Sequence, residues 1–264
     1  MNVMVAALWE FRGFILGSVQ REFQTKYRNS LLGGVWLVLP PLAQILVYTL
    51  IFSQIMQARL PGVESHFAYS IYLCAGVLTW GLFAEITSRS MGVFIENANL
   101  IKKLSFPRIS LPFIVIISAG VNFTIVFGLF TLFLILTGSF PGWIFLAIVP
   151  VFCVQVLFSI GVGVTLGVLN VFFRDVGQFF GIVLQFWFWL TPIVYPASIL
   201  PEGVRSLMAF NPMAVLIESY QRILVTGEWP HWDKVAIVAL VSLGLCALAL
   251  RLFRIRSSEM VDEL

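Results

Sequence analysis

Long apolar segments alternate with short polar segments along almost the whole chain, and this pattern predicts an all-α integral membrane protein. A helix that spans a bilayer needs about 20 mostly apolar residues. No charged residue occurs between Arg108 and Arg174, and this stretch is too long for one span. The turn-forming residues 138–143 (GSFPGW) divide it into two. We therefore expect six spans, over residues 33–56, 69–92, 111–136, 143–170, 177–195 and 235–253.

Lysine and arginine gather in alternate connecting segments, and this bias sets the expected orientation of the spans. The side rich in these residues carries Arg12, Arg21, Lys26, Arg28, Lys102, Lys103, Arg108, Arg174, Arg251, Arg254 and Arg256. The other side carries Arg59, Arg205, Arg222 and Lys234. The richer side is expected to be cytoplasmic, so both termini are predicted to lie in the cytoplasm.

Residues 4–21 precede the first expected span and are not apolar enough to cross the bilayer. On a helical wheel Ile15 and Val19 lie on an apolar side, while Gln20 and Arg21 lie on the opposite side. This distribution favours an amphipathic helix in the cytoplasmic interface of the membrane. A frayed chain end is the alternative.

The segment between the last two spans, residues 196–232, is the longest expected outer loop and is not simply polar. Apolar side chains repeat there at helical spacing at Met213, Leu216, Ile217, Tyr220 and Leu224. We expect one short helix that begins at Pro201 and a second that follows the Asn-Pro break at residues 211–212. On the polar face Glu218 and Arg222 are expected to form an i,i+4 ion pair. Both helices are predicted to dip back towards the membrane.

Composition agrees with a membrane protein and excludes other classes. Of the 264 residues 59% are hydrophobic and 11% are charged, and the mean hydropathy is +0.97. A soluble domain carries about 25% charged residues. The net charge of +3 does not indicate nucleic-acid binding, because the charges are sorted by side of the membrane. Cys74, Cys153 and Cys246 all lie in apolar segments, which favours buried thiols over disulfides.

Catalytic and cofactor motifs are missing from the sequence. No glycine precedes a lysine, so the chain has no P-loop and no nucleotide site of that kind. His66 and His231 lie in separate outer loops without metal-ligand spacing. We therefore expect no enzyme activity, no metal and no cofactor in this chain.

One ionisable pair lies inside an expected span. Glu85 and Arg89 are four residues apart on the second span. A lone charge near the centre of the bilayer costs about 2.5 to 3.5 kcal/mol on insertion scales. Glu85 is therefore expected to face the bundle interior, a cavity or Arg89. The pair is interpreted as an inner gate or as a packing pair, and a proton relay is the less favoured reading.

The fourth span places Ser159, Gly163 and Gly167 on one face. Small residues at this spacing allow two helix backbones to approach closely. We expect this face to pack within the chain rather than to form a dimer contact.

Five motifs occur in a fixed order and together resemble the membrane subunit of type-2 ABC exporters. They are residues 27–42 (YRNSLLGGVWLVLPPL), 97–108 (NANLIKKLSFPR), 170–178 (NVFFRDVGQ), 190–196 (LTPIVYP) and 211–213 (NPM). The resemblance covers about residues 15–256. Within that family the chain is most similar to the branch that exports O-antigen, capsular and teichoic-acid polysaccharides, and to the O-antigen exporters in particular.

The resemblance implies a half-transporter of the bacterial inner membrane. Such a chain forms a homodimer, binds two copies of a separate P-loop ATPase and moves a lipid-linked polysaccharide among membrane lipids, without nucleic acid. The expected division is an interface helix (residues 1–30), a transmembrane domain (31–256) and a cytoplasmic tail (257–264).

Residue roles implied by the resemblance fall into three groups. The ATPase-coupling helix would include Glu96, Asn97, Leu100, Lys102, Lys103 and Phe106. The entrance for the lipid headgroup would include Arg28, Leu32 and Gly33. The outer gate would include Pro196, Asn211, Pro212 and Tyr220.

Aromatic residues in or near the spans are candidates for the path of a sugar polymer. Sugar rings have apolar C–H faces that can lie on aromatic rings, and a conduit needs contacts that release easily. We expect the lining to include some of Trp36, Tyr48, Phe83, Trp187 and Trp189, and the others to be core.

Three alternative functions stay open. A type-2 exporter of a drug or a lipid would have the same fold. An ion-coupled carrier would need more carboxylates within the membrane, and repeat symmetry would favour it. A membrane enzyme acting on lipid carriers would need clustered Asp or His at one membrane face. A P-loop protein encoded beside this gene would favour the ABC exporter.

Overall fold

The computed structural model describes residues 9–26, 28, 33–51, 60, 67–103, 106–257 and 259–263. Within these ranges the chain is all-helical, as predicted. The elements are α2 (Arg12–Lys26), η1 (Gly33–Leu37), α3 (Leu39–Tyr48), α4 (Ala68–Glu96), α5 (Ala98–Lys103), α6 (Ser110–Leu136), η3 (Gly142–Ala147), α7 (Ile148–Phe172), α8 (Asp175–Leu190), η4 (Ala197–Ile199), α9 (Glu202–Met208), α10 (Pro212–Gln221), η5 (Arg222–Thr226), α11 (Trp232–Arg256) and α12 (Glu259–Glu263).

Five helical segments in the described part of the chain are long and apolar enough to span a membrane. They are Gly33–Ile51, Ala68–Glu96, Ser110–Leu136, Gly142–Phe172 and Trp232–Arg256. Each coincides with an expected span. Residues 52–56 of the first expected span lie outside the described residues.

The remaining expected span, residues 177–195, corresponds to α8, which is shorter than predicted. The helix has 16 residues and ends at Leu190. Thr191 already has extended backbone angles, with φ −104° and ψ 135°. Pro192 explains this end, because the residue before a proline is disfavoured in helical geometry and a proline has no N–H to continue the helix. In the sequence, the apolar residues Ile193 and Val194 continue the hydrophobic pattern past Leu190, so the pattern does not show where the helix ends.

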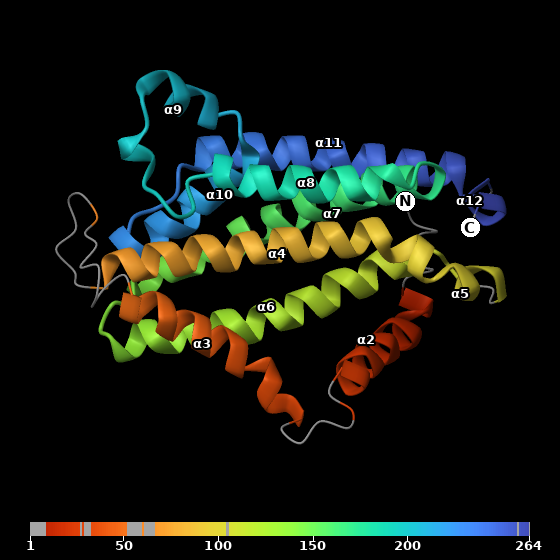
Figure 1. Cartoon of the computed structure of the whole chain (residues 1–264), viewed down its shortest axis with the longest axis horizontal. Coiled ribbons are helices and arrows are strands. Elements are labelled where there is room, and N and C mark those ends of the chain that lie inside the picture. Colours follow the sequence, from red (N-terminus) through yellow and green to blue (C-terminus); the bar gives the residue numbers. More distant parts are fainter. Residues whose placement is uncertain are drawn as a thin grey trace.

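The long helices lie side by side along the long axis of the molecule (Figure 1). Helix α7 packs against both α4 and α11, and α4 packs against α6. One end of the bundle carries α5 and α12, at the right of Figure 1. The opposite end carries α9 and the start of α11. The described part of α2 packs against α6, on the side of the bundle away from α11.

Glycines on α7 set the close approach of its two neighbours. A Cβ atom on Gly163 would lie 2.7 Å from the Cβ of Ser90, and one on Gly167 would lie 2.6 Å from the Ser90 carbonyl oxygen. On the other side, a Cβ on Gly161 would lie 2.9 Å from the Cβ of Leu245 on α11. The expectation that the small face of this span packs within the chain is therefore confirmed.

Substitution of Gly167 by alanine is expected to destabilise the bundle. The added methyl group would meet the backbone of α4, which cannot move aside as a flexible side chain can, so we expect a loss of about 1 to 3 kcal/mol. Gly120→Ala on α6 is the matched control, because no atom of the described residues beyond its own helical turn lies within 4 Å of its Cβ position. Thermal unfolding in detergent compares the two variants. Equal stability of Gly167→Ala and wild type would contradict the close contact.

Candidate functional site

The chain turns sharply after α4 and forms the short helix α5. Glu96 is the last residue of α4, and the side chain of Asn97 donates to the carbonyl oxygen of Val93 over 2.8 Å. The backbone N–H of Asn97 donates to the same carbonyl oxygen over 3.3 Å, so the backbone and the side chain of the cap residue bind one acceptor. Asn97 therefore closes the last turn of α4 before α5 begins at Ala98.

Helix α5 has one face against the bundle and one face in the open. Ile101 is buried, and Leu100 and Phe106 are partly buried against the same core cluster. The Phe106 ring lies 5.3 Å from the ring of Phe14 on α2. The exposed side chains of the segment are Glu96, Asn99, Lys102 and Lys103. Of the residues expected in the coupling helix, three are therefore exposed, and Leu100 and Phe106 also serve the packing of their own chain.

A network of ion pairs and hydrogen bonds joins α2, α4 and α6. Arg89 on α4 contacts two carboxylates, with Nη2 2.7 Å from Glu22 Oε1 and Nη1 3.3 Å from Glu85 Oε1. The Ser118 hydroxyl donates to Glu22 Oε2 over 2.7 Å, and the Asn122 amide donates to Glu85 Oε2 over 3.0 Å. All four carboxylate oxygens therefore have a partner, as a stable polar network requires.

A cavity of about 210 Å³ lies between α2, α4, α5 and α6. Its lining includes Ser18, Glu22, Arg89, Glu96, Asn97 and Leu100. The charged network and the expected coupling residues thus border one space, which brings Glu22 of α2 close to the coupling segment that follows α4.

A second, open cavity of about 580 Å³ lies where η1 and α3 face α6. Trp36, Gln44, Lys26 and Asn122 are among the residues that line it. Asn122 also belongs to the charged network, so the two sites touch. Of the residues expected at the headgroup entrance, Arg28 is exposed and Gly33 begins η1 with φ +46°. Leu32 lies outside the described residues.

The aromatic residues expected in the substrate path differ in their surroundings. Phe83 is fully buried, with its ring 5.3 Å from Trp80, 5.3 Å from Trp187 and 5.7 Å from Phe158. Trp189, in contrast, is 60% exposed. This burial favours a packing role for Phe83.

Two other path candidates lie near the first span. Trp36 is 46% exposed and borders the cavity of about 580 Å³. Tyr48 is half-buried, and its hydroxyl accepts a hydrogen bond from the Gln44 side chain over 3.0 Å.

The expected outer-gate residue Asn211 joins α8 to α10. Its Oδ1 accepts from Trp187 Nε1 over 2.9 Å and from the Met213 backbone N–H over 3.1 Å. Its Nδ2 donates to Thr191 Oγ1 over 3.0 Å. Asn211 is the N-cap of α10 and Pro212 is the first residue of that helix, both favourable choices. The start of α10 is therefore fixed to the end of α8.

The other two expected gate residues lie apart from this junction. Pro196 has extended backbone and precedes η4. Tyr220 is fully buried, with its ring 6.3 Å from Phe127 on α6. Tyr220 therefore anchors α10 in the core of the described structure.

Several residues of these sites were not expected from the sequence. Glu22 is on a different helix from Arg89, and nothing in the local pattern of residues 9–26 says which helix α2 contacts. Ser118 and Asn122 were missed for the same reason. The available signals were that Arg89 lies within an expected span with one nearby acid, and that Asn122 is one of the few polar residues on α6.

Comparison with known proteins assigns the chain to a family. The sequence profile of the ABC-2 type transporter family matches residues 15–225. The chain is 31% identical, over 99% of both chains, to the O-antigen export system permease protein RfbA of Myxococcus xanthus. It is 29% identical to RfbA of Klebsiella pneumoniae, over 88% of each chain. It is 23% identical to the polysialic acid transport protein KpsM of Escherichia coli, over 92% of this chain and 93% of the relative. The chain is therefore a permease of the ABC-2 type transporter family, homologous to O-antigen export permeases.

Proposed function

We propose that this chain is the membrane subunit of an ATP-driven exporter that moves a lipid-linked polysaccharide, of the O-antigen kind, from the cytoplasm across the bacterial inner membrane. The observation that carries the proposal is the similarity to an O-antigen export permease over 99% of both chains. The similarity to the polysialic acid transport protein is weaker, at 23% identity, and export of a capsular polysaccharide is therefore our second candidate.

In this proposal α8 is the fifth of six spans, and the bundle end that carries α5 faces the cytoplasm. Helix α5 ends in Lys102 and Lys103, and the last turn of α11 carries Arg254 and Arg256, which fits the positive-inside rule. Helix α8 would reach about 24 Å, at 1.5 Å for each of its residues, and the extended residues after it would complete the crossing. The termini would then both be cytoplasmic.

Thiol labelling tests this orientation. In a chain without Cys74, Cys153 and Cys246, a single cysteine at the exposed position Glu228 is expected to react with an impermeant thiol reagent added to intact spheroplasts. A cysteine at Asn99, which is also exposed but lies on α5, is expected to react only after the membrane is opened. Labelling of both positions from outside would contradict the six-span arrangement.

The ATPase partner is proposed to bind the open face of α5. This face carries Glu96, Asn99, Lys102 and Lys103, which are exposed among the residues that the structure describes. A movement of α5 would change the shape of the cavity of about 210 Å³, because Asn97 and Leu100 border it together with Glu22 and Arg89. The charged network would then carry the movement to α2 and α6.

A second copy of the chain is proposed to face α8. Phe179, Ile182, Phe186 and Trp189 form an exposed apolar stripe along this helix. Directly after the stripe, residues 191–196 leave helical geometry. Irregular backbone at membrane depth is tolerated only against protein or a water-filled cavity, and not against lipid. A homodimer with a central pathway would provide both.

The cavity of about 580 Å³ is proposed as the entrance for the lipid headgroup. It has a basic residue, Lys26, and an aromatic residue, Trp36, at its rim, with Arg28 close by in the sequence. Cationic side chains suit a phosphate group. Asn122 lines the same cavity and donates to Glu85, so an occupant would touch the charged network directly.

Alanine substitutions separate path residues from core residues. Trp189→Ala is expected to slow export several-fold and to leave the amount of folded protein unchanged, because its side chain is 60% exposed. Phe83→Ala is the contrasting variant and is expected to lose about 3 to 5 kcal/mol of stability, as large core truncations do. Export per folded molecule is the quantity to compare. If Trp189→Ala loses folded protein in step with export, the path assignment fails.

Deletion of the gene tests the function as a whole. We expect lipid-linked polysaccharide to accumulate in the cytoplasmic leaflet and to disappear from the cell surface. A deletion strain with normal surface polysaccharide and a defect in the export of a drug or another lipid would favour the second function, a type-2 exporter of small molecules.

A further inference from the structure

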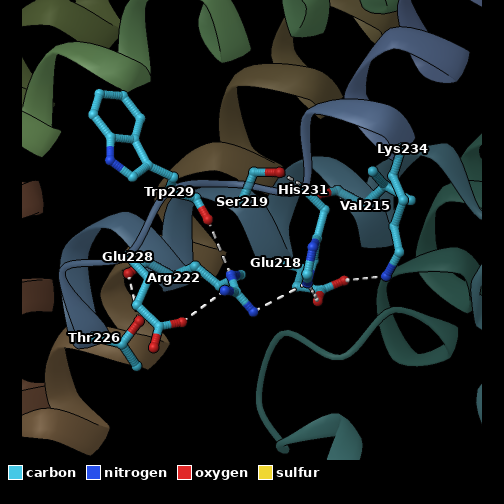
Figure 2. A network of polar contacts seen from close by, with 9 residues as sticks. All are labelled: Val215, Glu218, Ser219, Arg222, Thr226, Glu228, Trp229, His231 and Lys234. Carbon is cyan, nitrogen blue, oxygen red and sulfur yellow. Dashed lines mark hydrogen bonds and ion pairs between the residues drawn. The ribbon is translucent and has the colours of Figure 1, made fainter.

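Five ionisable side chains meet where α10 ends and α11 begins (Figure 2). They are Glu218 on α10, Arg222 at the start of η5, Glu228 and His231 in the connecting segment, and Lys234 in the first turn of α11. We call residues 222–231 the Arg222 turn. The proposed function makes no use of this cluster.

Arg222 closes the turn through three contacts. Its Nη2 lies 2.6 Å from Glu228 Oε2, and its Nε donates to the carbonyl oxygen of Trp229 over 3.3 Å. Its Nη1 lies 3.1 Å from Nε2 of His231. Gly227, with φ 65°, reverses the chain between these partners. Arg222 thus binds the far side of its own loop. The sequence pattern had predicted a different partner, the Glu218 carboxylate four residues before it.

As a hydrogen bond, the contact between Arg222 and His231 requires a neutral imidazole. A guanidinium has only N–H donors, so the histidine nitrogen that faces it must be the acceptor. Nε2 can accept only when it carries no proton, with the ring neutral and the proton on Nδ1. The geometry of the Arg222 turn is therefore that of a neutral His231.

The same nitrogen has a second partner within reach. Nε2 of His231 lies 3.9 Å from Glu218 Oε1, and Lys234 Nζ lies 3.8 Å from Glu218 Oε2. Arg222 and Lys234 balance Glu218 and Glu228, and Asp233 adds one further acid in the first turn of α11. A proton on Nε2 would place two donors 3.1 Å apart at Arg222 and would make Glu218 the nearest acceptor.

We propose that His231 is a pH-sensitive switch at the end of α10. When neutral, it holds the Arg222 turn closed by accepting from Arg222. When protonated, it leaves Arg222 for Glu218, where it competes with Lys234, and the turn loosens. Histidine is the side chain that ordinarily changes charge between about pH 5 and pH 8. The side chain of His231 is 44% exposed, so protons reach it from the solvent.

The switch acts on α10, whose N-cap is Asn211. Helix α10 is fixed at its start to Trp187 and Thr191, and the Arg222 turn fixes its end to α11. Loosening the turn removes the constraint at the end of α10, while the buried side chain of Tyr220 and the contacts of Asn211 still hold the rest of the helix. If the proposed function holds, a low pH outside the cell would ease movement of the outer gate. Only this consequence of the switch rests on the proposed function.

Amide hydrogen exchange of the purified full chain in detergent tests the switch without ATPase or substrate. The background variant His66→Gln leaves His231 as the only histidine, since the chain has two. Within that background, exchange of peptides covering residues 218–234 is compared with that of a chain that also carries His231→Gln. A glutamine can accept from Arg222 and does not titrate. The ratio of the two exchange rates at one pH cancels the intrinsic pH dependence of exchange.

We expect the two chains to exchange alike at about pH 7.5 and the chain with His231 to exchange about fivefold faster at about pH 5.5, the effect of losing one hydrogen bond. A His231→Lys variant, which is permanently charged, is expected to exchange fast at both pH values. An equal ratio at both pH values, or slower exchange of the His231 chain in acid, would overturn the proposal. Because neither export nor the ATPase is measured, this result is independent of whether the proposed function is correct.

Discussion

Reversing the charge of Arg89, in an Arg89→Glu variant, is expected to remove most of the folded protein. Arg89 is the common partner of Glu22 and Glu85, so the variant would leave three carboxylates together between α2, α4 and α6. An unpaired charge within the membrane costs about 2.5 to 3.5 kcal/mol on insertion scales. The yield of monodisperse protein in size-exclusion chromatography, followed by thermal unfolding, measures the effect.

A charge exchange shows whether the contact itself is responsible. In the double variant Glu22→Arg with Arg89→Glu, the ion pair between α2 and α4 is restored in the opposite sense, and we expect part of the folded protein to return. Arg251→Glu is the matched control, because this arginine is exposed on α11 and its reversal should have little effect. If the double variant is no better than the single variants, the network does not hold α2 in place.

A bulky residue on the open face of α5 is expected to abolish ATP-dependent export. In Asn99→Trp the indole would occupy the surface where we propose that the ATPase binds, and tight complementary packing at such a contact does not tolerate added volume. Asn99 is exposed, so the fold of the permease itself should be unchanged. Co-purification of the ATPase and export per folded molecule are the measurements.

Two further variants separate binding from folding. Ser206→Trp adds the same side chain at an exposed position of α9, at the other end of the bundle, and should leave ATPase binding intact. Leu100→Asp should lower both ATPase binding and the amount of folded protein, because Leu100 is packed against its own core. Normal co-purification with Asn99→Trp would exclude this face of α5 as the binding surface.

Local chemistry allowed much of the fold to be predicted from the sequence. Apolar length and turn residues located the long helices, and the Asn-Pro pair at residues 211–212 marked the start of α10. The spacing of Glu85 and Arg89 indicated a contact inside the bundle, and the structure places them 3.3 Å apart. Each of these features depends on residues that are neighbours along the chain.

Features that depend on tertiary contacts could not be predicted in this way. Periodicity showed that Tyr220 lies on the apolar side of its helix, but not that the core of the bundle covers it completely. The i,i+4 rule paired Arg222 with Glu218, yet α10 ends at Gln221 and Arg222 turns towards Glu228 instead. Glu22 reaches Arg89 only because α2 lies against α6, which no pattern within residues 9–26 specifies.

Reconstitution tests the central claim most directly. The chain and the proposed P-loop ATPase are inserted into liposomes that carry a lipid-linked polysaccharide on the ATPase side, and the amount of polymer on the other side is measured by protection from an impermeant glycosidase. We predict that polymer crosses only when ATP and this chain are both present, and that an ATPase variant that cannot hydrolyse ATP does not support the movement. Polymer that stays in place while ATP is hydrolysed by the assembled complex would contradict it.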